Sequence, residues 1–258
     1  MSTLLVRGIG ELCTCDPARG AAPGVVRDAA VLAHDGVVTF AGPEGDLPAP
    51  ASDVDLVQIE AGGAAVLPGF VDAHTHIVWL GDRSAEYAAR AAGVSYEQIA
   101  REGGGIAATV AATAGGTVEE LTAAARIRAR RALRGGTTTI EVKSGYGLTH
   151  EAEMRQLDAG LALRADPDLP HVVTTYLPLH AAPADGRERF LDDVCTRGVS
   201  EAASRARFVD AFCEPGAFSV EECARVFTAA QHHGLRVKVH AEQRSHSGGA
   251  RLAARMHA

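Results

Sequence analysis

Aromatic residues, excess positive charge and long apolar runs are all scarce in this sequence, and each scarcity excludes a class of protein. Aromatic residues make up 5% of the 258 residues and hydrophobic residues 47%, so we expect a sizeable core packed by small aliphatic side chains. The formal net charge is −7 with both signs dispersed, which offers no basic surface to a nucleic acid. No apolar run is long enough to cross a membrane, and residues 1–7 do not begin a signal peptide. We therefore expect neither a nucleic-acid partner nor a membrane partner.

Cysteine is also rare, and its placement excludes a disulfide scaffold. The five cysteines are odd in number and have no regular spacing. This usage is typical of a reduced, cytoplasmic chain.

Residues 1–65 have the pattern of a small β domain. Asp35-Gly36 lies between the apolar runs 31–33 and 37–41, which predicts a tight hairpin. Residues 54–59 alternate polar and apolar side chains, as a half-buried strand does. We predict a β-sandwich-like domain over residues 1–65.

Two histidines spaced two residues apart close the next stretch, Pro68-Gly69-Phe70-Val71-Asp72-Ala73-His74-Thr75-His76. Alternate side chains of a strand point to one face, so His74 and His76 should project into the same space. Neutral imidazole is the commonest metal ligand in proteins. An isolated His-x-His pair also arises by chance on surfaces, but its place after a Pro-Gly turn and an apolar strand favours a metal site.

Strands and helices then alternate along residues 66–258. Capping-box patterns at Thr117 with Glu120 and at Ser219 with Glu222 mark the starts of two helices. The predicted strands are 137–142, 172–177, 208–213 and 235–240, and the predicted helices are 84–92, 96–102, 117–133, 150–164, 187–195, 202–206, 219–232 and 241–258. Such alternation predicts a parallel sheet.

Polar residues follow each of these strands where it ends: His74 and His76, then Lys143 and Tyr146, His180, Glu214, and His240. Ligand-type residues at successive strand ends are typical of a (β/α)8 TIM-type barrel. An open doubly wound sheet also places ligands at strand ends, but it does not usually converge histidines from several strands, and no glycine-rich phosphate loop follows the first strand. We therefore predict an α/β barrel over residues 66–258, with only about five of the eight strands, and expect the sequence to be a fragment.

Several motifs in this sequence resemble a known family. Pro68-Gly69-Phe70-Val71-Asp72-Ala73-His74-Thr75-His76 resembles the first metal-binding strand of the amidohydrolase superfamily. The motifs Gly81-Asp82-Arg83, Gly103-Gly104-Gly105-Ile106, Lys143-Ser144-Gly145-Tyr146-Gly147-Leu148 and Val239-His240-Ala241-Glu242-Gln243 together resemble the imidazolonepropionases. The first motif is shared by many hydrolases, whereas the last two are highly specific.

The resemblance implies a barrel enzyme that hydrolyses 4-imidazolone-5-propanoate to N-formimino-L-glutamate with one Zn or Fe ion. It implies His74, His76 and His240 as metal ligands. The family's aspartate ligand on the last barrel strand, and a histidine after the sixth strand, match no position of this chain. A carbamylated Lys143 bridging two metals does not fit, because the family binds one metal.

The resemblance also implies the residues that contact a small-molecule substrate. Arg83 would bind the propanoate, because a guanidinium holds a carboxylate with two hydrogen bonds. Tyr146 and Gln243 would contact the substrate, and His180 would contact it and donate to the imidazolone oxygen. Either Glu242 or Gln243 occupies the position that handles the proton of water, and only Glu242 titrates.

Two other interpretations remain open at the level of sequence. The chain could be another mononuclear amidohydrolase, for example one that deaminates a heterocycle, although Arg83 and Tyr146 favour a substrate with a carboxylate. It could also be a non-catalytic remnant that binds a metal or a partner through an exposed sheet edge. Exposed barrel helices often pair, so a homodimer is one expectation for the assembly.

Overall fold

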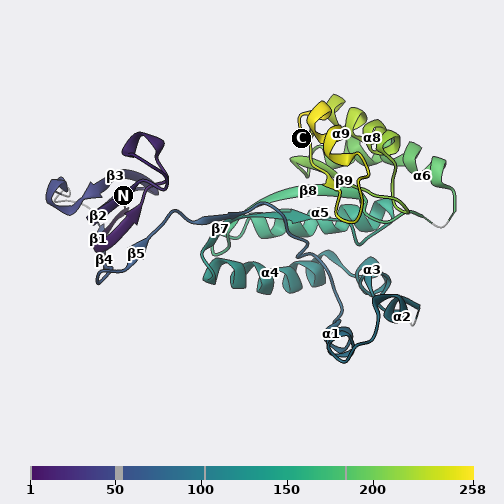
Figure 1. Ribbon diagram of the computed structural model, residues 1–258, viewed down its shortest axis with the longest axis horizontal. Helices are drawn as coiled ribbons and strands as arrows, with labels where there is room; N and C mark the ends of the chain where they lie inside the picture. Colours follow the sequence, from purple (N-terminus) through teal and green to yellow (C-terminus); the bar gives the residue numbers. More distant parts are fainter. Residues whose placement is uncertain (1, 50–54, 102, 184) are drawn as a thin grey trace. The chain divides into compact units, whose positions relative to one another are not determined.

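The structure is a computed structural model that describes residues 2–49, 55–101, 103–183 and 185–258. The chain divides into two compact units, Met1–Gly69 and Phe70–Ala258 (Figure 1). None of the described helices is both long and apolar enough to cross a membrane.

The first unit is a five-stranded sheet in which β1 occupies the centre. Its strands are β1 (Ser2–Cys13), β2 (Val25–His34), β3 (Val37–Pro43), β4 (Asp55–Glu60) and β5 (Ala65–Val66), with short 3-10 turns at Pro17–Arg19 and Glu44–Asp46. The order is β3-β2-β1-β4, and β5 also pairs with β1. The described residues of this unit thus form one sheet rather than two facing ones.

The hairpin between β2 and β3 forms where the sequence predicts it. Asp35 and Gly36 both have positive φ angles, 46° and 80°, as a tight two-residue hairpin requires. The expectation for the strand at residues 54–59 is wrong in one respect. Residue 54 lies outside the described residues, and every residue of β4 is exposed rather than every second one.

The second unit is built on a curled parallel sheet. Its strands are β6 (Phe70–Asp72), β7 (Thr137–Lys143), β8 (His171–Leu179), β9 (Phe208–Cys213), β10 (Arg236–Val237) and β11 (His240–Ala241). They pair in the order β10-β9-β8-β7-β6, with β11 beside β9, and every pair is parallel. Spatial order therefore follows chain order without the reversal that defines a doubly wound sheet, and this favours the predicted barrel arrangement.

Helices connect these strands, and most begin where the sequence predicts. They are α1 (Ser84–Ala91), α2 (Tyr96–Arg101), α3 (Ile106–Ala114), α4 (Val118–Arg134), α5 (His150–Arg164), α6 (Arg187–Asp193), the π-helical turn η3 (Val194–Gly198), α7 (Val199–Ala202), α8 (Val220–His232) and α9 (Gly249–Met256). Both predicted capping boxes form, at the starts of α4 and α8. Each box satisfies N–H groups that the first helical turn leaves without a partner.

Four expectations about individual elements are wrong. No helix is predicted between residues 102 and 117, whereas the structure has α3 there, directly after the glycine run at 103–105. The predicted helix at 202–206 ends at Ala202. The strand predicted at 235–240 is interrupted between β10 and β11. The predicted helix at 241–258 shrinks to α9, because Glu242 and Gly248 adopt positive φ angles of 55° and 85° that a helix cannot contain.

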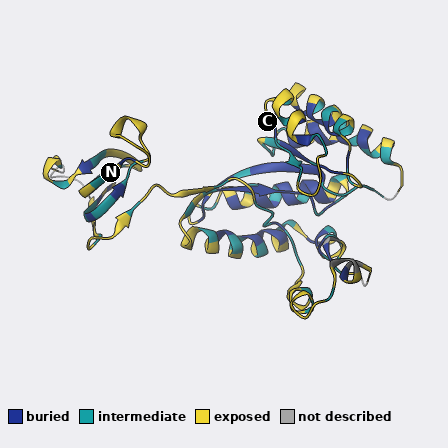
Figure 2. Cartoon of the chain, viewed as in Figure 1, coloured by how far each residue is buried: buried dark blue, intermediate teal, exposed yellow. Residues whose placement is uncertain are grey.

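The core of this unit lies between the sheet and the helices that cover it. Figure 2 shows buried residues concentrated along β7, β8 and β9 and on the helix faces toward them, while α4 keeps one face exposed. Phe227 of α8 is wholly buried in this core, and burying such a side chain contributes about 1.5–3 kcal/mol. Tyr176 of β8 is buried against η3, where a Cβ on Gly198 would lie 2.6 Å from the tyrosine hydroxyl.

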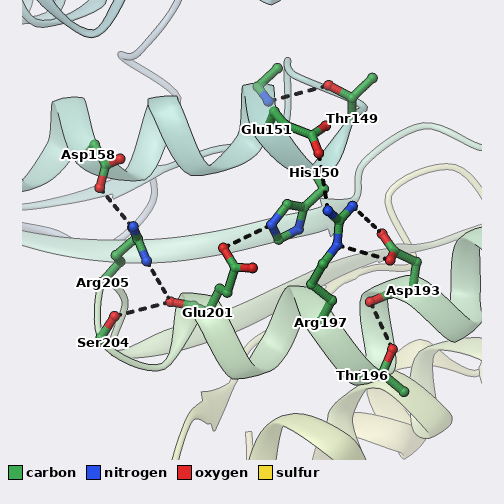
Figure 3. Close-up of polar contacts among 11 residues, drawn as sticks. Thr149, His150, Glu151, Asp158, Asp193, Thr196, Arg197, Glu201, Ser204 and Arg205 are labelled. Atoms are coloured by element: carbon green, nitrogen blue, oxygen red, sulfur yellow. Dashed lines mark hydrogen bonds and ion pairs between the residues drawn. The ribbon is translucent and has the colours of Figure 1, made fainter.

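A network of ion pairs joins α5 to η3 and α7 on the outside of the unit (Figure 3). Arg197 lies 3.2 Å from Glu151 and 3.0 Å from Asp193. Arg205 lies 2.8 Å from Asp158. Exposed pairs of this kind contribute roughly 0–1 kcal/mol each, so they support the packing of these helices without determining it.

Candidate metal centre

The structure brings together the three histidines that the sequence nominates. His74 and His76 follow β6, which ends at Asp72, and His240 begins β11. One ring nitrogen from each of the three lies within 4.8 Å of the others. The Nε2 atoms of His76 and His240 are 3.2 Å apart, and the rings of His74 and His240 have centroids 4.5 Å apart. Segments far apart in the sequence thus converge on one point at the carboxyl ends of the strands.

The pKa values of two of these imidazoles, His74 and His76, are lowered. Burial and the neighbouring His180 and His240 lower the pKa of His76 to about 3. Burial also lowers the pKa of His74, with His240 as the next cause. Neutral imidazoles retain the lone pair that a metal ligand needs. In addition, the buried His76 Nδ1 atom has no hydrogen-bond partner among the described residues.

The donor set fits a metal ion. Imidazole nitrogens are ligands that Zn and Fe accept, and three of them lie within mutual reach here. The contact between two Nε2 atoms also requires explanation, because it is a hydrogen bond only if one of the two is protonated. A cation shared by the rings removes that requirement.

A charged network that the sequence did not predict lies behind His240. Asp210 Oδ2 lies 3.0 Å from His240 Nδ1 and 2.7 Å from Lys143 Nζ. Burial alone would raise the pKa of Asp210, but His240 and Lys143 hold it well below its ordinary value. One sequence signal could have revealed this network, namely Asp210, an acidic residue in the middle of the otherwise apolar strand 208–213. The interpretation of Lys143 as an ordinary polar residue at a strand end missed its complete burial.

The loop that carries Tyr146 is held by two side chains of α5. Gln156 Oε1 accepts hydrogen bonds from the N–H groups of residues 145 and 146, at 3.2 and 3.0 Å. Glu153 Oε1 accepts from the N–H groups of residues 147 and 148, at 2.7 and 2.9 Å. Four consecutive N–H groups are therefore satisfied, and the position of Tyr146 is fixed from behind.

The two glycines beside Tyr146 allow close packing of this loop. Gly145 has a φ of +119°, and a Cβ there would lie 2.9 Å from His180 Nδ1. A Cβ on Gly147 would lie 2.5 Å from the backbone nitrogen of Glu153. The close approaches that these glycines allow are to His180 and to α5.

His180 and Tyr146 lie beside the three histidines. The His180 ring stacks on His76 with centroids 5.2 Å apart, and the Tyr146 ring is 5.2 Å from His180. His180 Nδ1 lies 2.7 Å from the carbonyl oxygen of Gly145. Because a carbonyl only accepts, Nδ1 carries the proton and Nε2 carries the lone pair in the neutral ring. Burial lowers the pKa of His180 and so favours that neutral form.

A cavity of about 720 Å³ opens beside the histidines. Its lining consists of His180, Ala181, Ala182, Phe212, Gly216, Ala217, His240, Gln243 and Arg244. Gln243 therefore lines the cavity, and its contact with a substrate stays a prediction. Glu242 is not in this lining, and its carboxylate lies 3.4 Å from His246 Nδ1. Glu214 fixes the loop behind Gln243 by accepting from the Arg244 N–H at 3.0 Å.

Arg83 lies at the start of α1 and is not in the lining of the cavity. Its Nε and Nη2 atoms donate to Glu86 Oε2 at 2.9 and 2.7 Å. Burial raises the pKa of Tyr146, and the charge of Arg83 acts in the opposite direction. Arg83 is therefore an electrostatic neighbour of Tyr146, with its guanidinium already bound to a carboxylate.

Two curated relatives confirm the resemblance that the motifs indicate. An imidazolonepropionase from Deinococcus radiodurans is 44% identical over 260 residues, which cover 98% of this chain and 63% of that protein. An imidazolonepropionase from Deinococcus deserti is 45% identical over 263 residues, which cover 99% of this chain and 64% of that protein. The chain therefore spans less than two thirds of the length of these relatives.

Solved structures and a family match complete the comparison. A 5-methylcytosine deaminase from Klebsiella pneumoniae superimposes with a TM-score of 0.65 at 18% identity, covering 98% of this chain and 55% of that one. An amidohydrolase crystal structure gives a TM-score of 0.56 at 19% identity, covering 93% of this chain and 56% of that one. These likenesses support the barrel-type α/β fold and nothing finer. The sequence of residues 65–256 matches the Amidohydrolase family, and the chain therefore belongs to that family.

Proposed function

We propose that this chain supplies metal-binding and substrate-binding residues for the hydrolysis of 4-imidazolone-5-propanoate to N-formimino-L-glutamate. The observation that carries the proposal is the convergence of His74, His76 and His240, in a chain 44–45% identical to proteins named imidazolonepropionase. The substrate is a small molecule, and neither a nucleic acid nor a membrane is part of the proposal.

His74, His76 and His240 would hold one Zn or Fe ion. Such an ion, when bound, lowers the pKa of a water molecule toward neutrality and polarises an amide carbonyl. The three histidines contribute by holding their ring nitrogens within 4.8 Å of one another.

His180 would accept a proton rather than donate one. Its Nδ1 proton is engaged by the Gly145 carbonyl at 2.7 Å, so Nε2 is an acceptor in the neutral ring. The role expected from the resemblance, donation to the imidazolone oxygen, would require the cationic ring. An acceptor beside the cavity instead suits a substrate ring N–H or the proton of the attacking water.

Gln243 and Tyr146 would orient the substrate from two sides of the site. The Gln243 amide both donates and accepts, and it lines the cavity together with His180. The Tyr146 phenol keeps its proton because burial raises its pKa, so it acts as a neutral hydrogen-bonding group. Proton handling by Glu242 requires its carboxylate to turn away from His246. Arg83 would bind the propanoate by sharing its guanidinium between the substrate and Glu86.

Turnover of 4-imidazolone-5-propanoate by the full gene product, loaded with Zn or Fe(II), tests the proposal. Formation of N-formimino-L-glutamate by the wild type, and its loss in a His76→Ala variant, is the expected result. A His233→Ala variant serves as the control, because His233 is an exposed residue at the end of α8. No ring opening, together with deamination of a heterocyclic amine, would instead assign the centre to an aminohydrolase.

A further inference from the structure

Four charged side chains, of which the first three are buried, form a cluster in contact with His240 and with the segment that carries His74 and His76: Glu141, Lys143, Asp210 and Lys238. Lys143 Nζ lies 2.7 Å from Glu141 Oε2 and 2.7 Å from Asp210 Oδ2. Lys238 Nζ lies 2.7 Å from Glu141 Oε1. The side chains of Lys143, Asp210 and Glu141 are 0%, 2% and 3% exposed. Two carboxylates and two ammonium groups balance one another, as burial of charge requires.

One end of this cluster fixes His240. Asp210 Oδ2 lies 3.0 Å from His240 Nδ1. The two atoms do not meet the geometry of a hydrogen bond, but a carboxylate at this distance favours the tautomer with its proton on Nδ1. The neutral imidazole then carries its lone pair on Nε2, the atom that lies 3.2 Å from His76 Nε2. Asp210 is itself held, because its Oδ1 accepts from the Ala211 N–H at 2.7 Å and its Oδ2 contacts Lys143.

The other end of the cluster fixes the segment that carries His74 and His76. Lys238 Nζ donates to the carbonyl oxygen of Ala73 at 3.0 Å. The hydroxyl of Thr75 donates to the backbone carbonyl of Glu141, and the Thr75 carbonyl accepts from the Lys143 N–H at 3.2 Å. Residues of the charged cluster therefore contact both parts of the histidine cluster, Asp210 through His240 and Lys238, Glu141 and Lys143 through the segment 73–75.

We infer that Asp210 is a positioning residue for the metal centre of the proposed function, on which this inference rests. Asp210 selects the tautomer and the orientation of His240, and Lys143 holds the carboxylate in place. Asp210 does so through His240, because its carboxylate contacts Nδ1 and not the ring atom directed at His76. A carboxylate that orients a ligating histidine in this way typically changes metal affinity by about 10–100-fold when it is removed.

Zinc affinity of the metal-free chain measures this role without any turnover. We would titrate the wild type, Asp210→Asn and Asp210→Ala with zinc against a chromophoric chelator, with folding checked by circular dichroism. Both variants should bind zinc about 10–100-fold more weakly. The matched control is Asp158→Asn, which removes the carboxylate paired with Arg205 on the outside of the unit (Figure 3) and should leave the affinity unchanged.

Nitrogen-15 NMR of the histidine rings gives a second readout that a purely structural role would not move. The metal-free wild type should show His240 protonated at Nδ1, and Asp210→Asn should show a mixture of tautomers. Wild-type His240 protonated at Nε2 would overturn the inference without the need for any variant. Unchanged zinc affinity in a folded Asp210→Asn would overturn it too. Unchanged affinity in His240→Ala would instead count against the proposed metal centre itself.

Discussion

The Nε2 atoms of His76 and His240 lie 3.2 Å apart, although 164 residues separate the two histidines in the sequence. Both rings are partly or wholly shielded from water, and His74 contributes a third nitrogen to the same space. Like atoms at this distance are held together by the fold rather than by their own attraction. A cation bound by all three rings would relieve this contact.

Zinc should therefore stabilise the chain, and His76→Ala should abolish most of that effect. A ligand that binds only the folded state at 100 times its Kd adds about 2.7 kcal/mol to the free energy of unfolding. Thermal unfolding with and without zinc measures the difference. His150→Ala is the control, because His150 pairs with Glu201 at 3.0 Å outside the centre. Equal zinc stabilisation in wild type and His76→Ala would mean that zinc binds elsewhere.

Acid should destabilise the metal-free chain through the same histidines. The pKa of His76 falls from 6.5 to about 3 in the folded chain, so between these values the unfolded chain binds a proton that the folded chain does not. Stability is therefore complete above about pH 6.5 and decreases as the pH falls toward 3. Urea unfolding across this range should show the decline, and His76→Gln should flatten it. A His233→Gln control that flattens the curve equally would refute the assignment to His76.

The sequence predicts the histidine cluster well because its signal is local and periodic. His74 and His76 are two residues apart, and each strand end is marked by a glycine, a proline or a change of periodicity. The parallel order of the strands follows from the alternation of strand and helix, which leaves few topologies open. These signals all lie within short segments, and short-range patterns are what can be recognised in a single sequence.

The charged cluster could not be predicted in the same way, because it depends on register between strands. Asp210 meets Lys143 only because β8 lies between β7 and β9 and carries a small residue, Thr175, whose hydroxyl bonds Glu141 at 2.5 Å. A lysine at the end of one strand and an aspartate in the middle of another give no sign in the sequence that they contact each other. The failed helix prediction at 241–248 has a similar cause, since Glu214 of a neighbouring segment holds that loop.

The buried side chain of Glu153 should stabilise the fold through the hydrogen bonds that it accepts, whereas its negative charge should destabilise the fold. Burial raises its pKa, although Ser144 and the N–H groups of the loop oppose the shift. A raised carboxyl pKa means that its contribution is present at low pH and is lost as the pH rises through the folded pKa. Glu153→Gln should therefore gain stability relative to the wild type between pH 4 and pH 7, as measured by urea unfolding.

Removal of the side chain should have the opposite effect. Glu153→Ala leaves the N–H groups of residues 147 and 148 without their acceptor, and each unsatisfied buried group costs about 1–3 kcal/mol. Glu119→Gln, an exposed acid in the first turn of α4, is the control and should show little change at either pH. If Glu153→Gln became less stable than the wild type as the pH rises, the negative charge of the carboxylate would instead be needed for the stability of the fold.

Arg83 should contribute to substrate binding through the carboxylate of the substrate and not through its ring. Its Nε and Nη2 atoms already hold one carboxylate, that of Glu86, whose second oxygen accepts from the Gly105 N–H at 2.9 Å. The guanidinium is thus anchored by Glu86, and hydrogen bonds to a charged group contribute about 1.5–3 kcal/mol. Arg83→Gln should weaken binding of imidazole propanoate by roughly 10–100-fold, as measured by calorimetry with the zinc-loaded chain.

The uncharged ligand 4-methylimidazole separates this role from a structural one. It presents the same ring without the carboxylate, so Arg83→Gln should leave its affinity unchanged. Arg83→Lys should recover only part of the propanoate affinity, because an ammonium lacks the planar fork that contacts both carboxylates. Arg90→Gln, on the exposed side of the same helix, should bind both ligands as the wild type does. Equal losses for the two ligands in Arg83→Gln would mean that Arg83 shapes the loop through Glu86, and the specificity for a carboxylate would then have to come from another cation near the cavity.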